Sequence, residues 1–251
     1  TKLYLGERLV ARFESDDFIH WKNSGMVLRS TAEEGKATQT YALTPFRYGN
    51  VWLGYVMMYH AGKGRAVDCE LAWSPDSIAW KRVTPGVAFI PRGPKGSYDS
   101  ECIYAMAGPA IAQENDLLIY YGGSETPHLG WKRHCLLSLA RLPLDRFAGY
   151  EPVEKGKAAV LESGAFTVGD GPLRLSADAE GGSIRVQALD REGAVLAESE
   201  PITANVTDAP VRWQRGDFAA LKGKPVKFRI ELSNAKIFAL GGVTLSDPKL
   251  Q

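Results

Sequence analysis

Apolar residues in the first 150 positions fall in short runs separated by polar turns, and no run keeps a helical period. Aromatic-rich runs occupy residues 51–59 and 117–121. Each is followed by a polar loop and then by a run containing Leu and Ala, at residues 70–73 and 137–141. Short runs bounded by Gly, Asn and Pro are typical of β-strands. We therefore expect an all-β protein.

A turn motif recurs within this order of strands. The pattern Ser-x-Asp-x-Ile-x-Trp occurs at residues 15–21 and 74–80, and a weaker third copy lies at residues 139–147. The Asp of such a turn bonds its own backbone, and we expect the Trp to cover a hydrophobic seam. A repeat of roughly sixty residues with four short strands is typical of one propeller blade.

About two and a half such blades fit before residue 150, and a closed ring needs at least four. We therefore expect the remaining blades upstream of residue 1 or on a second polypeptide.

After residue 150 the pattern changes to clean alternation of apolar and polar residues, which predicts a small antiparallel β-sandwich. Two domains are therefore expected, at residues 1–150 and 151–251. Trp213 and Phe218 are expected to be exposed, but they are too few to form a sugar-stacking platform, which favours a structural role. One helical turn is predicted near residues 216–221. The alternating segments are residues 171–177, 183–190, 194–200, 211–214, 226–232 and 237–243.

Composition narrows the possible partners. The formal net charge of the 251 residues is +1, which gives no electrostatic reason to expect nucleic acid or an anionic membrane as a partner. No apolar run is long enough to span a bilayer. Cys69, Cys102 and Cys135 lack paired spacing and are expected to be small buried hydrophobes. The histidines lack metal-ligand spacing, so we expect no metal and no cofactor.

The strongest candidate for chemistry is the segment at residues 97–106. Asp99 and Glu101 stand two residues apart, directly before an apolar run. If a strand begins at Asp99, both carboxylates share a face with Ile103, and Tyr104 points the other way. Two carboxylates that flank a glycosidic bond can divide the roles of acid and of nucleophile or base. The alternative is that Asp99 caps a turn and Glu101 is a solvated residue of the rim.

Two further carboxylates, Asp68 and Glu70, lie on or beside a predicted strand. Asp68 could instead be a turn residue. Glu70 enters an apolar strand and needs a partner if it is buried; Arg65 and Arg141 are the candidates. A structural ion pair competes with a catalytic role for Glu70.

Histidine and aromatic side chains supply candidate sugar contacts. His60 and His128 follow aromatic strands and could bond sugar hydroxyls, whereas His20 is expected to be an exposed scaffold residue. Tyr41, Tyr104 and Trp131 could stack on sugar rings, and Arg65 could bind a charged sugar. Aromatic side chains inside a propeller can equally serve packing between blades.

With these turns and strands, the chain resembles the five-bladed β-propeller glycoside hydrolases related to families 32, 43 and 130. It resembles most closely the bacterial "family 32 N-terminal-like" proteins, which add a C-terminal β-sandwich. The resemblance covers nearly the whole chain. Its motifs are at residues 15–21, 41–45, 68–72, 74–80, 89–91, 98–104, 120–123 with His128, 139–147, 211–213 and 223–229.

The resemblance implies a secreted enzyme, extracellular or periplasmic, that hydrolyses glycosidic bonds in a polysaccharide or oligosaccharide at the channel mouth. Asp99, Glu101 and Glu70 would be its catalytic carboxylates. A non-catalytic carbohydrate-binding propeller is the alternative, and residues 38–40 favour it, because related members often carry an acidic residue there. A scaffold for protein interactions is a third possibility. The substrate-binding residues would be Tyr41, His60, Asp68, Tyr104, His128 and Trp131.

Overall fold

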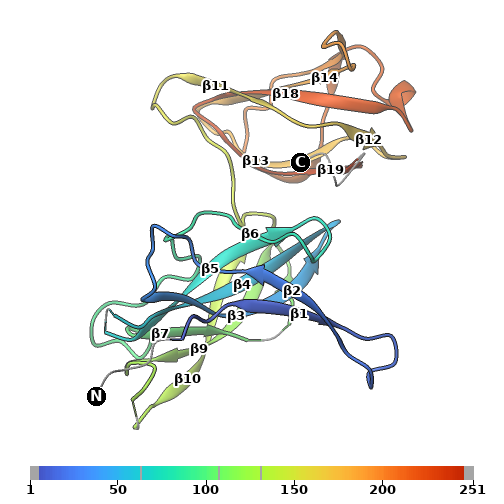
Figure 1. Ribbon diagram of the computed structural model, residues 1–251. Coiled ribbons are helices and arrows are strands. Elements are labelled where there is room, and N and C mark those ends of the chain that lie inside the picture. The colour runs from blue at the N-terminus through green and yellow to red at the C-terminus, as the bar shows by residue number, and fades with distance from the viewer. Residues whose placement is uncertain (1–5, 63, 107, 131, 246–251) are drawn as a thin grey trace. The chain divides into compact units, whose positions relative to one another are not determined.

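The computed structural model describes residues 6–62, 64–106, 108–130 and 132–245. The described residues form β-sheets, in which all strand pairs but one are antiparallel, and one short 3-10 helix (Figure 1), so the all-β expectation is confirmed. The chain divides into two compact units, Thr1–Leu142 (unit 1) and Pro143–Gln251 (unit 2). Within the described residues, no helix has the length and apolar character needed to cross a bilayer.

Unit 1 is built on an eight-stranded sheet with the order β10-β9-β7-β5-β4-β3, in which β6 pairs with β5 and β8 with β9. The sheet curls, so that β4 and β7 contact each other although β5 separates them. The strands are β3 (Thr38–Tyr48), β4 (Val51–His60), β5 (Ala66–Ser74), β6 (Lys81–Arg82), β7 (Cys102–Ala105), β8 (Ile111–Gln113), β9 (Asp116–Ser124) and β10 (Cys135–Pro143).

Strand β4 explains the aromatic-rich run in the sequence. Its residues 53–59 are all buried, without alternation. A strand covered on both faces is apolar on both faces, so the run is continuous. Val56 and Met58 pack with Leu28, Ala72 and Trp80 on one side of the sheet.

The two matched turns of the sequence have the same geometry. Oδ1 of Asp17 accepts hydrogen bonds from the backbone N–H groups two and three residues later, at 2.8 and 2.7 Å, and Oδ1 of Asp76 does the same at 2.8 and 2.8 Å. The hydroxyls of Ser15 and Ser74 donate to these oxygens at 3.1 and 3.0 Å. The predicted bonding of each Asp to its own backbone is confirmed.

The tryptophans of the two turns differ in environment. Nε1 of Trp80 donates to the carbonyl of Ser77 at 2.9 Å, and Nε1 of Trp21 donates to that of Phe18 at 3.3 Å. Trp80 is 8% exposed and covers the apolar seam, as predicted. Trp21 is 52% exposed, at the tip of the hairpin of β1 (Val10–Glu14) and β2 (Lys22–Leu28), so that expectation is wrong for the first copy.

Unit 2 has a seven-stranded and a three-stranded sheet, and both contribute to one apolar core. Strands β14 and β18 lie in one layer and β13 and β19 in the other (Figure 1). Buried and exposed side chains alternate along β18, as the sequence pattern predicts. The elements are β11 (Ala158–Glu162), β12 (Phe166–Val168), β13 (Arg174–Asp178), β14 (Ser183–Leu189), β15 (Val195–Ser199), β16 (Val206–Pro210), β17 (Trp213–Arg215), η1 (Ala219–Leu221), β18 (Pro225–Ser233), β19 (Lys236–Gly241) and β20 (Val243–Leu245).

Two details of unit 2 differ from the sequence prediction. Strands β11, β12 and β16 lie outside the segments expected from alternation. Phe218 is buried rather than exposed, because its ring stacks on Trp213 with centroids 4.6 Å apart and also packs near Phe228.

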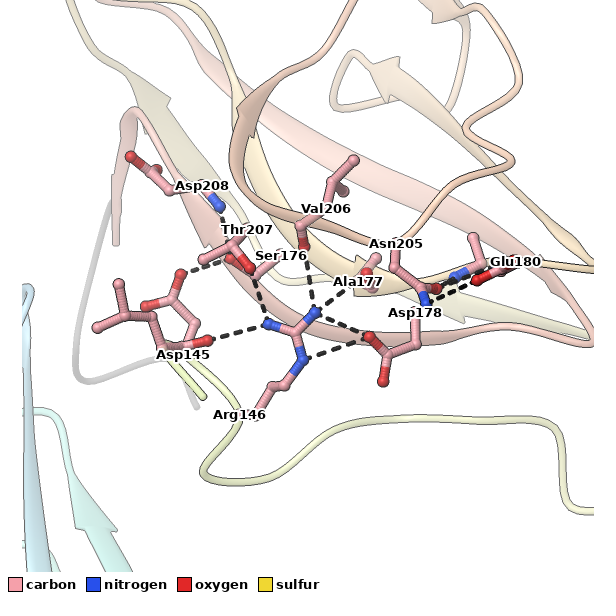
Figure 2. Close-up of polar contacts among 12 residues, drawn as sticks. Asp145, Arg146, Ser176, Ala177, Asp178, Glu180, Asn205, Val206, Thr207 and Asp208 are labelled. Atoms are coloured by element: carbon pink, nitrogen blue, oxygen red, sulfur yellow. Dashed lines mark hydrogen bonds and ion pairs between the residues drawn. The ribbon is translucent and has the colours of Figure 1, made fainter. Parts of the chain in front are cut away.

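Residues just after the junction of the units are bound to unit 2. Arg146 donates to Asp178 and Thr207 at 2.8 and 2.9 Å (Figure 2). Tyr150 pairs with Ile237 through two backbone hydrogen bonds of 2.9 and 3.0 Å. The segment before the expected boundary at residue 150 therefore makes its contacts within unit 2.

Candidate functional site

Three tyrosine rings from separate strands of unit 1 gather around one histidine. Tyr41 of β3, Tyr59 of β4 and Tyr104 of β7 have ring centroids 4.7, 5.1 and 5.9 Å from that of His128, which follows β9. We call these four residues the aromatic cluster. His128 is 8% exposed and Tyr41 is 37% exposed, so the cluster has a buried centre and an open edge.

Local backbone features place two members of the cluster. The register of β3 against β4 shifts between Thr40 and Ala42, so Tyr41 sits in a β-bulge, and a bulge re-aims the side chain that it carries. The backbone N–H of His128 donates to the carbonyl of Arg65 at 2.9 Å, which ties the loop after β9 to the turn before β5.

Electrostatics keep His128 neutral. Burial, and then the nearby charges of Arg133 and Arg8, lower the pKa of His128 below its usual value. Burial raises the pKa of Tyr104 far above its usual value, so its hydroxyl stays protonated. That hydroxyl lies 2.7 Å from Nδ1 of His128. With Tyr104 donating to Nδ1, the ring proton is on Nε2, which is then a hydrogen-bond donor.

Two arginines flank the cluster. The guanidinium of Arg8 lies 5.0 Å from the ring centroid of Tyr41 and 5.4 Å from that of Tyr59. The guanidinium of Arg133 lies 5.8 Å from the ring centroid of Tyr104. These are cation–π distances. Both arginines are exposed, so the open edge of the cluster is positively charged.

His60 and Asp68 form a separate pair. Nε2 of His60 is 2.8 Å from Oδ2 of Asp68, and Nε of Arg92 donates to Oδ1 at 2.6 Å. Burial would raise the pKa of Asp68, but its bonds to His60 and Arg92 outweigh burial and lower that pKa. Because Tyr59 and His60 are successive residues of β4, their side chains point to opposite faces of the sheet. The structure therefore separates His60 and Asp68 from the aromatic cluster.

Asp99 lies in a turn and not on a strand, because β7 begins only at Cys102. It is 7% exposed. The hydroxyl of Ser97 donates to Oδ1 at 2.8 Å and that of Tyr121 to Oδ2 at 2.9 Å. Burial raises the pKa of Tyr121, so this hydroxyl remains a donor. The expectation that a strand begins at Asp99 is wrong, because successive turns occupy residues 94–100.

Space around Asp99 depends on two glycines. A Cβ on Gly93 would collide with Oδ1 of Asp99, and a Cβ on Gly123 would lie 2.6 Å from its Cβ. Tyr121 pairs with Ala105 in the ladder of β7 and β9, and Tyr104 pairs with Gly122. Directly paired residues share a face and successive residues alternate, so the Asp99–Tyr121 pair and the Tyr104–His128 pair lie on opposite faces.

Glu101 directly precedes β7, the strand that carries Tyr104. Its backbone is fixed by hydrogen bonds to Val67 and Ser124, at 3.1 and 3.0 Å. Burial raises the pKa of the neighbouring Cys102 thiol, and the charge of Glu101 adds to that increase, while Arg133 opposes it. Glu101 and Arg133 therefore both act on a thiol close to Tyr104.

Glu70 is part of a buried ion pair. Nη1 of Arg82 donates to Oε2 of Glu70 at 2.8 Å, the N–H of Gly86 donates to Oε1 at 3.0 Å, and Arg82 also binds Glu34. Burial raises the pKa of Glu70 despite the charge of Arg82. The partners expected from the sequence are wrong: Arg82 lies on β6, directly beside β5, whereas Arg141 pairs with Asp116 at 3.6 Å.

The remaining predictions have mixed outcomes. Trp131 lies outside the described residues. Cys69 and Cys102 are buried as expected, but Cys135 at the start of β10 is exposed, because both faces of that strand's first residues are open. Among the residues the structure describes, no group of three or more His, Cys, Asp or Glu side chains is placed to hold a metal ion. Two pockets, of roughly 690 and 330 Å³, are lined by residues outside the cluster.

Sequence reasoning misses three contributors to the site. Tyr59 ends a continuous apolar run, and such a run indicates only a buried strand. Arg8 and Arg133 carry no local motif, and only the folded sheet brings these segments to the same rings.

Comparison with known proteins finds no matching family model and no matching curated protein. Among solved structures, a family 117 glycoside hydrolase from the marine bacterium Zobellia galactanivorans aligns with 90% of this chain and 71% of its own, at 12% identity and a TM-score of 0.45. An N-acetylgalactosamine deacetylase from F. plautii, in complex with blood group B trisaccharide, aligns with 55% of this chain and 42% of its own, at 17% identity and a TM-score of 0.41. BT0996, in its complex with RGII, aligns with 42% of this chain and 33% of its own, at 19% identity and a TM-score of 0.35. The alignment thus spans about a third of the length of BT0996, and the similarity to carbohydrate-active enzymes is distant.

Proposed function

We propose that the chain is a carbohydrate-binding protein of the glycoside hydrolase type and that it binds sugar at the aromatic cluster. The observation that carries this proposal is the cluster's geometry: the half-open ring of Tyr41 beside a buried, neutral His128. Sugar sites combine aromatic surface with a few fixed polar groups. The cluster supplies both.

Each member of the cluster has a distinct role in this proposal. Tyr41 offers an exposed ring to the apolar face of a sugar. Nε2 of His128 donates to a sugar hydroxyl, and Tyr104 holds the imidazole in the tautomer that makes this possible. His60 and Asp68 lie on the opposite face, so a sugar contact by them would belong to a second site.

The architecture proposed around this site is part of a five-bladed β-propeller followed by a β-sandwich. The two matched turns support it, because they repeat one hairpin with the same bonds. We propose that further blades, upstream or on another polypeptide, complete the ring, and that the protein acts outside the cytoplasm. A pull-down or native mass measurement of the purified protein tests for the second polypeptide.

Binding is tested with a glycan array followed by calorimetry on the sugars that bind. Tyr41→Ala is expected to weaken binding about tenfold or more, because a stacked aromatic contact is removed. Tyr120→Ala is the matched control, since Tyr120 is 39% exposed but lies outside the cluster. Equal losses in the two variants would contradict binding at the cluster.

Hydrolysis is the second candidate function, and the place of Glu101 directly before the strand that carries Tyr104 supports it. The backbone of Glu101 is held there by hydrogen bonds to Val67 and Ser124. Release of reducing ends from sugars that bind is the measurement. Loss of that release in Glu101→Gln, with binding retained, is expected of a hydrolase, whereas Asp99→Asn on the opposite face of the sheet should leave it unchanged. Binding without any release in the unmodified protein supports the non-catalytic alternative.

A further inference from the structure

The two arginines beside the aromatic cluster differ from most of the arginines around them. Arg8 and Arg133 come from segments 125 positions apart (133 minus 8), yet both guanidinium groups lie over rings of the same cluster. Among the described residues, neither has a carboxylate within ion-pair distance. The arginines of unit 1 that do have such a partner are Arg12, Arg29, Arg82, Arg92 and Arg141.

Nearby acidic residues do not neutralise this charge. Glu7, the sequence neighbour of Arg8, is paired with Arg29. Glu125, in the same loop as Arg133, is 3.5 Å from His134. The charge of Glu101 opposes that of Arg133 at Cys102, but Glu101 forms no ion pair with either arginine in the part of the chain that the structure describes. The open edge of the cluster therefore carries two cations that have no ion-paired carboxylate within the described ranges.

The arginines can leave the rings to meet an anion. Both are exposed, and an exposed cation–π contact is weaker than a bidentate bond between a guanidinium and a carboxylate or sulfate. Arginine is the side chain best suited to such planar recognition. Movement of Arg8 away from Tyr41 would also uncover the ring on which a sugar stacks.

We propose that the sugar bound at this cluster is anionic, with a carboxylate or sulfate held by Arg8 and Arg133. This inference rests on the proposed sugar binding and names the substrate class of the same site. One guanidinium lies over Tyr41 and the other over Tyr104. In this proposal one sugar unit stacks on Tyr41, and the carboxylate or sulfate of the oligosaccharide lies to the side of that unit, where the arginines reach it.

The test compares alginate hexamers with the same hexamers after reduction of their carboxyl groups, and a sulfated with an unsulfated galactan hexamer, by calorimetry at low and physiological salt. We expect at least one anionic sugar to bind about tenfold tighter than its neutral counterpart, since a charge-assisted bond is lost with the charge. Added salt should weaken the anionic sugar selectively.

Variants locate the interaction. Arg8→Gln and Arg133→Gln should each reduce the preference for the anionic sugar severalfold, and together they should abolish it. Arg47→Gln is the matched control, because Arg47 lies 5.4 Å over the ring of Trp52, away from the cluster. Thermal melts confirm that these exposed substitutions leave the fold unchanged.

The outcomes separate this inference from the proposed function. Equal affinity for charged and neutral sugars that Tyr41→Ala still weakens would overturn the anionic assignment and leave sugar binding in place. An anionic preference that persists in the double variant, or that Tyr41→Ala does not affect, also overturns it. Absence of binding to every sugar would overturn both proposals.

Discussion

The two units bury polar side chains in different ways. In the described part of unit 2, the buried polar residues are Ser176 and Ser199, and the core is otherwise apolar. Unit 1 buries charged or titratable groups at several places, including Glu70, Arg82, Asp99 and His128. Burial of such groups is costly unless each is paired. Unit 2 therefore avoids this cost with an almost wholly apolar core. Unit 1 instead holds charged and titratable side chains in fixed, buried positions.

Exposed apolar side chains sharpen the contrast. In unit 1, Phe18 is 83% exposed at the hairpin tip and Leu137 is 69% exposed on the edge strand β10. Large exposed apolar residues grouped on a hairpin or an edge strand are typical of surfaces that have a partner. This agrees with the proposal that further blades complete unit 1.

The largest effect is expected from a cavity in unit 2. Phe228→Ala should cost about 3–5 kcal/mol, because the ring is fully buried and contacts Phe166 and Phe218. Urea unfolding with hydrogen exchange resolved by unit is the measurement. A loss below about 1 kcal/mol would mean that unit 2 is not held by this core.

The buried ion pair of unit 1 provides the next test. Glu70→Gln should cost about 1–3 kcal/mol, because Arg82 loses one charged partner but keeps Glu34. If Glu70 is structural, sugar binding and any turnover survive in the folded variant. Loss of turnover in a variant with unchanged stability would instead assign Glu70 a catalytic role. The buried ion pair of unit 1 would then be part of the functional site and not only structural.

The matched turns should respond unequally to the same substitution. Asp76→Ala should cost about 1 kcal/mol, the value of a lost backbone cap, because two N–H groups beside the buried Trp80 lose their acceptor. Asp17→Ala removes the same bonds at an exposed tip and should cost less. Chemical unfolding of the two variants checks the order. A larger loss in Asp17→Ala would show that the first turn is buried in the protein in solution.

The smallest effect concerns pH. His128 has a lowered pKa in the folded protein, so the unfolded chain binds its proton first as pH falls below about 6.5. Stability from this group is thus present above that value and is lost as pH falls towards the folded pKa. Thermal midpoints between pH 7.5 and 5 in the unmodified protein and in His128→Phe measure it. A pH slope that is identical in both proteins would contradict this assignment.

Local bonding explains which features could be predicted from the sequence. The Asp17 and Asp76 turns form from residues within one heptapeptide, so their geometry follows from the motif. The partner of Glu70 depends on the pairing of β6 with β5. Because β6 has only two residues, the sequence shows no alternation from which that strand could be predicted. The contact of Arg8 with Tyr41 depends on the pairing of β3 with β4 and on the bulge at Tyr41. It therefore cannot be predicted from residue spacing in the sequence.

The position of the Asp99 side chain depends on the absence of side chains at Gly93 and Gly123. The constraint at Gly93 and Gly123 is space rather than backbone conformation, because a methyl group at either position would enter the volume that Asp99 occupies. In a mutational scan, substitutions at Gly93 and at Gly123 should therefore be tolerated as poorly as substitutions at Asp99. A substitution at Gly93 or Gly123 would displace the Asp99 carboxylate although Asp99 itself is unchanged. Genetic variation at two residues without side chains thus controls the position of this carboxylate.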